Sequence, residues 1–242
     1  RWRESYHSGA DITHKSSDSD GVASPHEHAV GIEKEALADY HFDKLPLRSL
    51  REFTAEHAPG AAGLGAFAGM NRANAPLKDW RIEGAGFVGS GSAGGARFEK
   101  RVAFESKTRL ACAWKIQEIE KNACFGVMLC LSLLTPEAPG RTLVIESAGK
   151  THEVIPGSAL DPLAASAFVL RDTHIGFALR VEFTGSGALL STAPVETLQR
   201  SENAFERVYQ GTIFSLCWDA ATLAKLGDAP SLSLEFLSED AK

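Results

Sequence analysis

The chain has 242 residues, of which 44% are hydrophobic, and its 31 acidic and 25 basic residues give a formal net charge of −6. A chain of this size and composition can bury one large core. The negative charge argues against nucleic acid and anionic membrane surfaces as partners. No apolar run approaches the roughly 18 residues of a membrane-spanning helix, and no signal peptide is recognisable.

The N-terminal part opens with polar sequence. Residues 14–21 are rich in Gly, Ser and Asp, which predicts a loop. Ser24 is followed by Pro25 and by Glu27, the arrangement of a capping box with proline in the first helical position. This pattern predicts a helix that runs to about Ala38.

A second short helix is predicted over residues 48–56, where Pro59 and Gly60 then stop it. We expect residues 1–79 to form a loop and helical segment that leads into a body formed by residues 80–242. The two parts are expected to make up one structural domain.

From Trp80 onward, apolar and polar residues alternate with a period of two, as in strands that bury one face. Between Ile175 and Phe183 the odd-numbered apolar residues share one face, and Arg180 and Glu182 lie on the other. Residues 123–134 are apolar on both faces and predict a central strand that is covered twice. The expected strands are 80–88, 96–106, 108–119, 123–134, 141–146, 151–155, 168–183, 187–199, 206–218 and the final segment 231–236.

These strands are enough for two packed antiparallel sheets. The segment that begins at Asp219 predicts one or two helical turns before the last strand. The predicted fold class is therefore all-β, a large antiparallel sandwich with a short helical segment near the N-terminus.

The cysteines lie in apolar, strand-like runs without the Cys-x-x-Cys spacing of zinc sites. We expect reduced, buried thiols, which favours a cytoplasmic location. The four residues are Cys112, Cys124, Cys130 and Cys217. The chain starts with Arg1 and its first methionine is Met70, so we expect it to be part of a longer protein.

Two motifs suggest ligands but do not fit them. Gly89 to Gly94 matches the pattern G-x-G-x-x-G, yet a strand-like segment follows where a dinucleotide site needs a helix, so we interpret it as a hairpin connection. His26 and His28 would lie about 200° apart on a helix and cannot share one metal ion. We predict no metal and no cofactor.

Residues 194–211, PVETLQRSENAFERVYQG, form a dense polar segment between apolar strand-like runs. The segment is either solvated or forms a buried or ligand-facing polar network. Glu202 and Glu206 could in principle act as the paired carboxylates of a glycosidase, but such a pair is weak evidence among 31 acidic residues.

The segment SENAFERVYQG, residues 201–211, resembles the pattern S-E-x-x-F-E-R-x-Y-Q-G of family 57 glycoside hydrolases of the 4-α-glucanotransferase and α-amylase type. The run APVETLQ before it and the segment LRDTHIGFALRVEF are similar to further motifs of that family. Looser matches occur in the family's order at residues 4–7, 24–37, 48–53, 63–67 and 125–134. The resemblance covers most of the chain.

The resemblance implies a β-supersandwich of the galactose-mutarotase-like kind that stands C-terminal to a (β/α) barrel. In the family the catalytic glutamate and aspartate belong to the barrel, and no part of a barrel is recognisable here. Catalytic residues are therefore not assigned to this chain. The family's first sandwich strands are expected to lie upstream of Arg1.

The chain departs from the family pattern at three places. Family members tend to have Leu-Gly-Asp-Phe where this chain has Ala66, and a histidine where it has Glu52. They also tend to have polar residues after Phe-Gly-Val, where this chain has Met128, Leu129 and Cys130. If these positions contact sugar in relatives, part of that contact is lost here.

Two interpretations of the polar segment follow. In one, its side chains form a hydrogen-bonded network that docks the sandwich on the barrel. In the other, they line a groove where carboxylates and amides bind sugar hydroxyls and the ring of Phe205, Tyr209 or Trp218 stacks on a pyranose. The candidate residues are Glu196, Gln199, Glu202, Phe205, Glu206, Tyr209 and Gln210.

The resemblance predicts a non-catalytic C-terminal domain of an α-glucan-processing enzyme, with the barrel and an α-glucan or malto-oligosaccharide as partners. The alternative is a stand-alone glycan-binding or scaffold module. A third hypothesis, a mutarotase-like epimerase, would need a histidine base and a glutamate in one groove, for which His174 and Glu206 are the nearest candidates.

Overall fold

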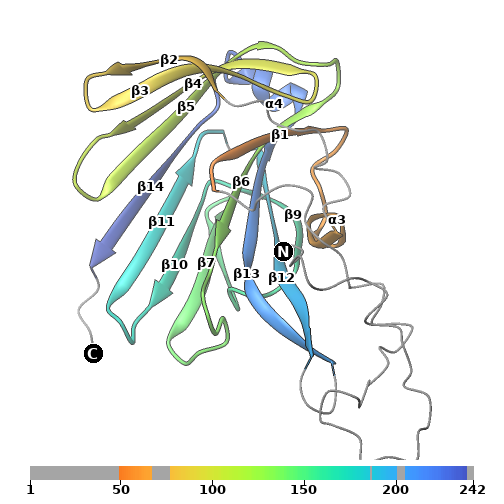
Figure 1. Ribbon diagram of the computed structural model, residues 1–242, viewed down its shortest axis with the longest axis vertical. Coiled ribbons are helices and arrows are strands. Elements are labelled where there is room, and N and C mark those ends of the chain that lie inside the picture. The colour runs from red at the N-terminus through yellow and green to blue at the C-terminus, as the bar shows by residue number, and fades with distance from the viewer. Residues whose placement is uncertain (1–48, 67–76, 186, 201–204, 239–242) are drawn as a thin grey trace, which may run out of the picture. The chain divides into compact units, whose positions relative to one another are not determined.

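The computed structural model describes residues 49–66, 77–185, 187–200 and 205–238 (Figure 1). Two compact units divide the chain. The larger comprises residues 48–195 and 211–242, and the smaller comprises residues 1–47 and 196–210. The loop and helix predicted between residues 14 and 38 lie outside the described residues.

In the described part of the chain, the first of two antiparallel sheets has five strands, and β6 is deeply buried within it. Within β6 every residue from Cys124 to Leu129 is buried, and the strand lies between β1 and β13. The predicted central strand that is covered on both faces is thus confirmed. The strands in sheet order are β1 (Arg51–Ala55), β6 (Cys124–Leu131), β13 (Phe205–Trp218), β12 (Ala188–Arg200) and β9 (Leu160–Ala165).

The second sheet has nine strands, and its two ends are formed by β2 and β8. Consecutive strands form hairpins at both ends, and the last strand of the chain, β14, pairs with β5 and β11 in the middle. In sheet order the strands are β2 (Lys78–Glu83), β3 (Gly86–Ala93), β4 (Ala96–Phe104), β5 (Arg109–Glu118), β14 (Ser231–Ser238), β11 (Phe177–Phe183), β10 (Ala167–Asp172), β7 (Arg141–Ser147) and β8 (Lys150–Val154).

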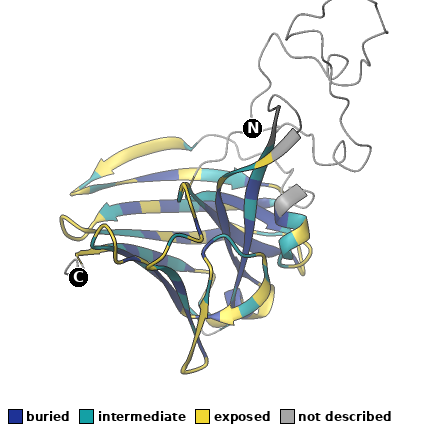
Figure 2. Ribbon diagram, turned by 90° about the horizontal axis from the view of Figure 1, so that it is seen from below, coloured by how far each residue is buried: buried dark blue, intermediate teal, exposed yellow. Residues whose placement is uncertain are grey.

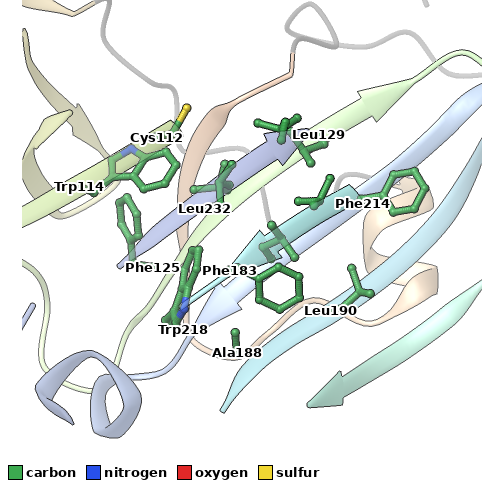
Figure 3. Packing of buried hydrophobic residues seen from close by; sticks show 14 of the residues in the cluster. Cys112, Trp114, Phe125, Leu129, Phe183, Ala188, Leu190, Phe214, Trp218 and Leu232 are labelled. Atoms are coloured by element: carbon green, nitrogen blue, oxygen red, sulfur yellow. The ribbon is translucent and has the colours of Figure 1, made fainter. Parts of the chain in front are cut away.

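The core of the larger unit joins the two sheets through aromatic pairs (Figure 3). Phe168 of β10 stacks on Phe214 of β13 with ring centroids 4.7 Å apart. Trp114 of β5 meets Trp218 of β13 at 6.5 Å. Such pairs add about 0.5–1.5 kcal/mol each to the free energy of burying their apolar surface. The predicted sandwich of two packed sheets is confirmed.

Two six-residue helices, α3 (Ala61–Ala66) and α4 (Ala220–Lys225), complete the described part. Asp219 caps α4, because its carboxylate accepts a hydrogen bond from the backbone N–H of Thr222 at 2.7 Å. The helical turn predicted after Asp219 is confirmed. Neither helix is long enough to cross a membrane.

The helix predicted over residues 48–56 is wrong. Residues 51–55 instead form β1, which pairs antiparallel with β6 and places Phe53 opposite Gly126. The ring of Phe53 occupies the space that a side chain at Gly126 would need, with Phe53 Cζ 2.2 Å from an ideal Cβ there. Long-range pairing with β6 overrides the local helical spacing.

Other boundaries differ in detail. The expected strand 168–183 is a hairpin of β10 and β11, the expected strand 80–88 covers both β2 and β3, and β9 was not predicted. Most of the Gly89–Gly94 segment lies in β3, and the hairpin turn is formed by Gly94 and Gly95. A strand, β4, follows that turn, which agrees with the rejection of a dinucleotide site.

The thiols agree with the sequence-based expectation. All four cysteines are free; three are buried and Cys130 is half-buried. Burial raises the pKa of Cys112 to about 11, although the nearby ammonium of Lys100 acts in the opposite direction. Cys112 is therefore a protonated part of the core at neutral pH.

Candidate functional site

Of the polar segment 194–211, residues 194–200 form the end of β12 and residues 205–211 the start of β13, and these two strands are neighbours in the five-stranded sheet. The amide Nε2 of Gln210 donates a hydrogen bond to the hydroxyl of Thr197 at 3.3 Å. It also lies 3.5 Å from the carbonyl oxygen of Val208. Thr197 was not among the predicted residues, although its place in the strand opposite Gln210 could have suggested it.

Alternation along the strands separates the other candidates. Successive side chains of a strand point to opposite faces. Since Gln210 contacts Thr197, Glu196 and Tyr209 lie on the opposite face of this strand pair. Glu196 and Tyr209 are half-buried and Gln210 is exposed. Glu196 and Gln210 therefore cannot belong to one polar network on a single face of the strand pair.

For the candidates Gln199, Phe205 and Glu206 the structure describes the backbone strand but not the side chain. Gln199 lies near the end of β12, and Phe205 and Glu206 begin β13. Glu202 lies outside the described residues. Trp218, considered as a stacking ring for sugar, is fully buried, and its indole N–H donates to the carbonyl oxygen of Thr184 at 2.7 Å. That role for Trp218 is therefore wrong, because the ring belongs to the core.

The Leu-Arg-Asp motif, residues 170–172, forms the end of β10, and its aspartate stabilises the turn that follows. The carboxylate of Asp172 accepts hydrogen bonds from Arg141 Nε at 2.8 Å and from the backbone N–H groups of His174 and Ile175 at 3.1 and 3.3 Å. Burial raises the pKa of Asp172, but the hydrogen bonds outweigh this and hold the pKa below its ordinary value. The motif thus fixes the connection between β10 and β11.

His174, the histidine of the epimerase hypothesis, lies in this turn and is exposed. The side chain of Glu206, its proposed partner, is not among those that the structure describes. In the described ranges, no three or more His, Cys, Asp or Glu side chains gather in a way that could hold a metal ion.

A buried ion pair that sequence reasoning did not find connects the sheets. Lys100 Nζ of β4 lies 2.7 Å from Glu52 Oε1 of β1, and both side chains are less than one-tenth exposed. The same carboxylate oxygen accepts a hydrogen bond from Trp114 Nε1 at 2.9 Å, and Lys100 also donates to the carbonyl oxygen of Leu50 at 2.7 Å. Glu52 therefore has a structural partner on the opposite sheet.

An apolar trough lies at the β2 end of the nine-stranded sheet, with a volume of about 540 Å³. Its walls come from β2 and the residue before it, from β3 and β4, and from the turn between β2 and β3. They comprise Leu77, Trp80, Ile82, Gly84, Ala85, Gly86, Phe87, Val102 and Phe104. Figure 2 shows how exposed this end is, and every residue of β2 from Lys78 to Ile82 is exposed.

Comparison with known proteins supports the resemblance found in the sequence. The family model described as "Alpha-amylase/4-alpha-glucanotransferase, C-terminal" matches residues 1–227. No curated protein sequence matches the chain. Among solved structures, the 4-α-glucanotransferase of Thermococcus litoralis aligns with a TM-score of 0.56 and 15% identity, over 85% of this chain and 29% of that enzyme.

Weaker structural similarities involve a heparan sulfate lyase and a heparinase. A heparan sulfate lyase HepC mutant of Pedobacter heparinus aligns with a TM-score of 0.38 and 11% identity, over 70% of this chain and 22% of that one. The heparinase III BT4657 gene product aligns with a TM-score of 0.40 and 11% identity, over the same shares of the two chains. At such scores these structures carry no functional argument.

The chain spans less than a third of the glucanotransferase that it resembles in structure. At 15% identity that likeness concerns the fold alone, whereas the family model covers nearly the whole sequence. The chain belongs to the family of C-terminal domains of α-amylases and 4-α-glucanotransferases.

Proposed function

We propose that this chain is the non-catalytic C-terminal domain of an α-glucan-processing hydrolase or 4-α-glucanotransferase, and that it stabilises the catalytic barrel. The single observation that carries the proposal is the family match over residues 1–227. The similar glucanotransferase, of which this fold makes up 29%, agrees with a larger enzyme around such a domain.

The physical role follows from the rigidity of the sandwich. Aromatic pairs and a buried ion pair join its sheets, so the domain offers a fixed surface. A neighbouring domain that packs on such a surface gains stability from the shared contact, because the contact exists only in the folded state.

The experiment compares the parent chain, defined as the longer enzyme in which this domain follows the catalytic barrel, with the barrel alone. We expect removal of the domain to lower both the melting temperature and the rate of glucan transfer from maltoheptaose. A rate loss of at least about tenfold corresponds to about 1.4 kcal/mol. A barrel that keeps its full stability and activity would refute the proposal and favour a stand-alone module.

A second candidate role is contact with the glucan itself at the strand pair of residues 196–210. The half-buried ring of Tyr209 and the exposed amide of Gln210 are two kinds of group that contact sugars, but because they lie on opposite faces they cannot converge on one sugar ring. Each face would then take part in a different contact.

Calorimetric titration of the chain with maltoheptaose tests this role. We expect saturable binding that Tyr209→Ala or Gln210→Ala weakens by about tenfold, which corresponds to about 1.4 kcal/mol. Phe236→Ala, at a half-exposed aromatic residue of β14, serves as the control and should leave binding unchanged. The absence of heat with a folded sample would exclude direct glucan contact.

A further inference from the structure

Four large apolar side chains form an exposed surface around the trough, here called the β2–β4 patch. The exposed fraction is 64% for Trp80, 76% for Ile82, 37% for Phe87 and 64% for Phe104. Contiguous apolar surface of this kind is unusual on a protein that acts alone, and commonly marks a contact with another protein surface.

The register of the strands shows which face carries the patch. Ile82 pairs with Phe87, and Phe87 pairs with Val102, so the three side chains share one face of the sheet. In β4 this is the face of the buried residue Phe98, which belongs to the core. The patch is therefore an extension of the core-facing side of the nine-stranded sheet.

The difference in width between the sheets explains the exposure. Nine strands lie in one sheet and five in the other, and β1 is the end strand of the five as the structure describes them. Residues on β2 to β4 that alternation directs toward a core thus extend beyond the described strands of the opposite sheet. These strands have the alternating apolar residues of a buried face, but the patch residues are exposed to solvent.

The polar groups of these strands lie on the other face. Arg81 pairs with Val88 and Val88 with Arg101, which places both arginines opposite to the patch. There Arg81 donates to Glu83 at 2.8 Å, and Arg101 also binds Glu83. A sugar site needs polar groups that converge on the ligand, so the all-apolar trough fits an apolar protein surface better than a glycan.

We propose that the β2–β4 patch is the surface on which the catalytic domain of the parent chain docks. This inference rests on the proposed function and adds the residues of the contact. The similar glucanotransferase is a single chain of which this fold covers 29%, so an enzyme of this kind has a large partner domain in the same chain. Contacts between domains of one chain typically bury about 600–1,500 Å².

Site-specific labelling tests the docking surface. Ile82→Cys and Leu134→Cys are made separately in the 242-residue chain and in the parent chain. Both replace an exposed apolar residue, since Leu134 is 85% exposed, and Leu134 lies outside the patch. The rate of maleimide labelling at each new cysteine is followed by peptide mass spectrometry, which separates it from the native thiols.

We expect Ile82→Cys to react at least about tenfold more slowly in the parent chain than in the 242-residue chain, since docked surfaces exclude solvent. Leu134→Cys should react equally fast in both. Equal rates at Ile82→Cys in the two chains would overturn the docking surface. The proposed function is tested separately, by the stability and activity of the barrel alone. Protection that depends on the concentration of the 242-residue chain would assign the patch to a second copy, and protection by maltoheptaose would assign it to a glycan; either result also overturns the inference.

Discussion

Replacing Lys100 by methionine removes the positive partner of a carboxylate that is buried between the two sheets. Lys100 Nζ and Glu52 Oε1 are 2.7 Å apart, and their side chains are 8% and 7% exposed. At an effective dielectric constant of about 20, two unit charges at this distance attract by about 6 kcal/mol. The desolvation of two buried ions costs several kcal/mol each, so the pair itself contributes little net stability.

The single substitution Lys100→Met has a larger effect on stability than the pair's small net contribution, because it leaves the negative charge of Glu52 without its compensating ammonium. Removal of one member of a buried pair typically costs about 3–5 kcal/mol. We expect Lys100→Met to lower the free energy of unfolding by this amount. The double variant Glu52→Gln with Lys100→Met should be less destabilised than Lys100→Met, because an amide can still accept the hydrogen bond of Trp114.

Urea denaturation followed by tryptophan fluorescence measures these effects, since Trp114 and Trp218 are buried in the core. Lys115→Met is the matched control, at an exposed lysine of β5, and should change stability by less than about 0.5 kcal/mol. If Lys100→Met costs less than about 1 kcal/mol, the site is more hydrated than its burial indicates and the reasoning fails.

Three further variants or reactions test single features. Gly126→Ala should destabilise the chain by about 1–3 kcal/mol in urea denaturation, because its new Cβ would lie 2.2 Å from Phe53 Cζ. Asp219→Ala should cost about 1 kcal/mol at pH 7 through loss of the cap on Thr222. Hydrogen bonds from Thr222 hold the pKa of Asp219 below its ordinary value, so this stabilisation is complete above the unfolded pKa of about 3.9 and is lost as the pH falls through the lower folded pKa. The urea curves of variant and wild type should therefore differ at pH 7 and converge as the pH falls through that folded pKa. Cys112, whose pKa is raised to about 11 by burial, should resist iodoacetamide at pH 8 in the native chain and react in denaturant, as mass spectrometry would reveal; rapid native labelling would contradict its burial.

Alternation with a period of two predicted most strands, because each strand buries one face against the opposite sheet. The same reasoning failed at residues 51–55, where the pairing with β6 and the contact of Glu52 with Lys100 decide the structure. Both partners are distant in the sequence, so no local pattern contains that information. The split of residues 168–183 into two strands depends on the hydrogen bonds that Asp172 makes in the turn.

The candidate site shows a related limit. The sequence located the polar segment 194–211 but not the distribution of its side chains, because a choice of face requires the register of two strands. The contact between Gln210 and Thr197 supplies that register. In the same way, alternation marks Ile82 and Phe104 as core-facing, but it cannot indicate that the described strands of the opposite sheet leave both side chains exposed.

The structure also changes the meaning of two of the departures from the family pattern, the one at Glu52 and the one at Met128 and Leu129. Met128 and Leu129 are buried, and Glu52 is held between the sheets by Lys100. None of these side chains is placed to bind a dissolved sugar, since each is nearly inaccessible to solvent. Burial in the protein interior accounts for these residue types; Leu129, for example, belongs to the core shown in Figure 3. Glu52, Met128 and Leu129 therefore give no reason to infer that glucan contact has been lost.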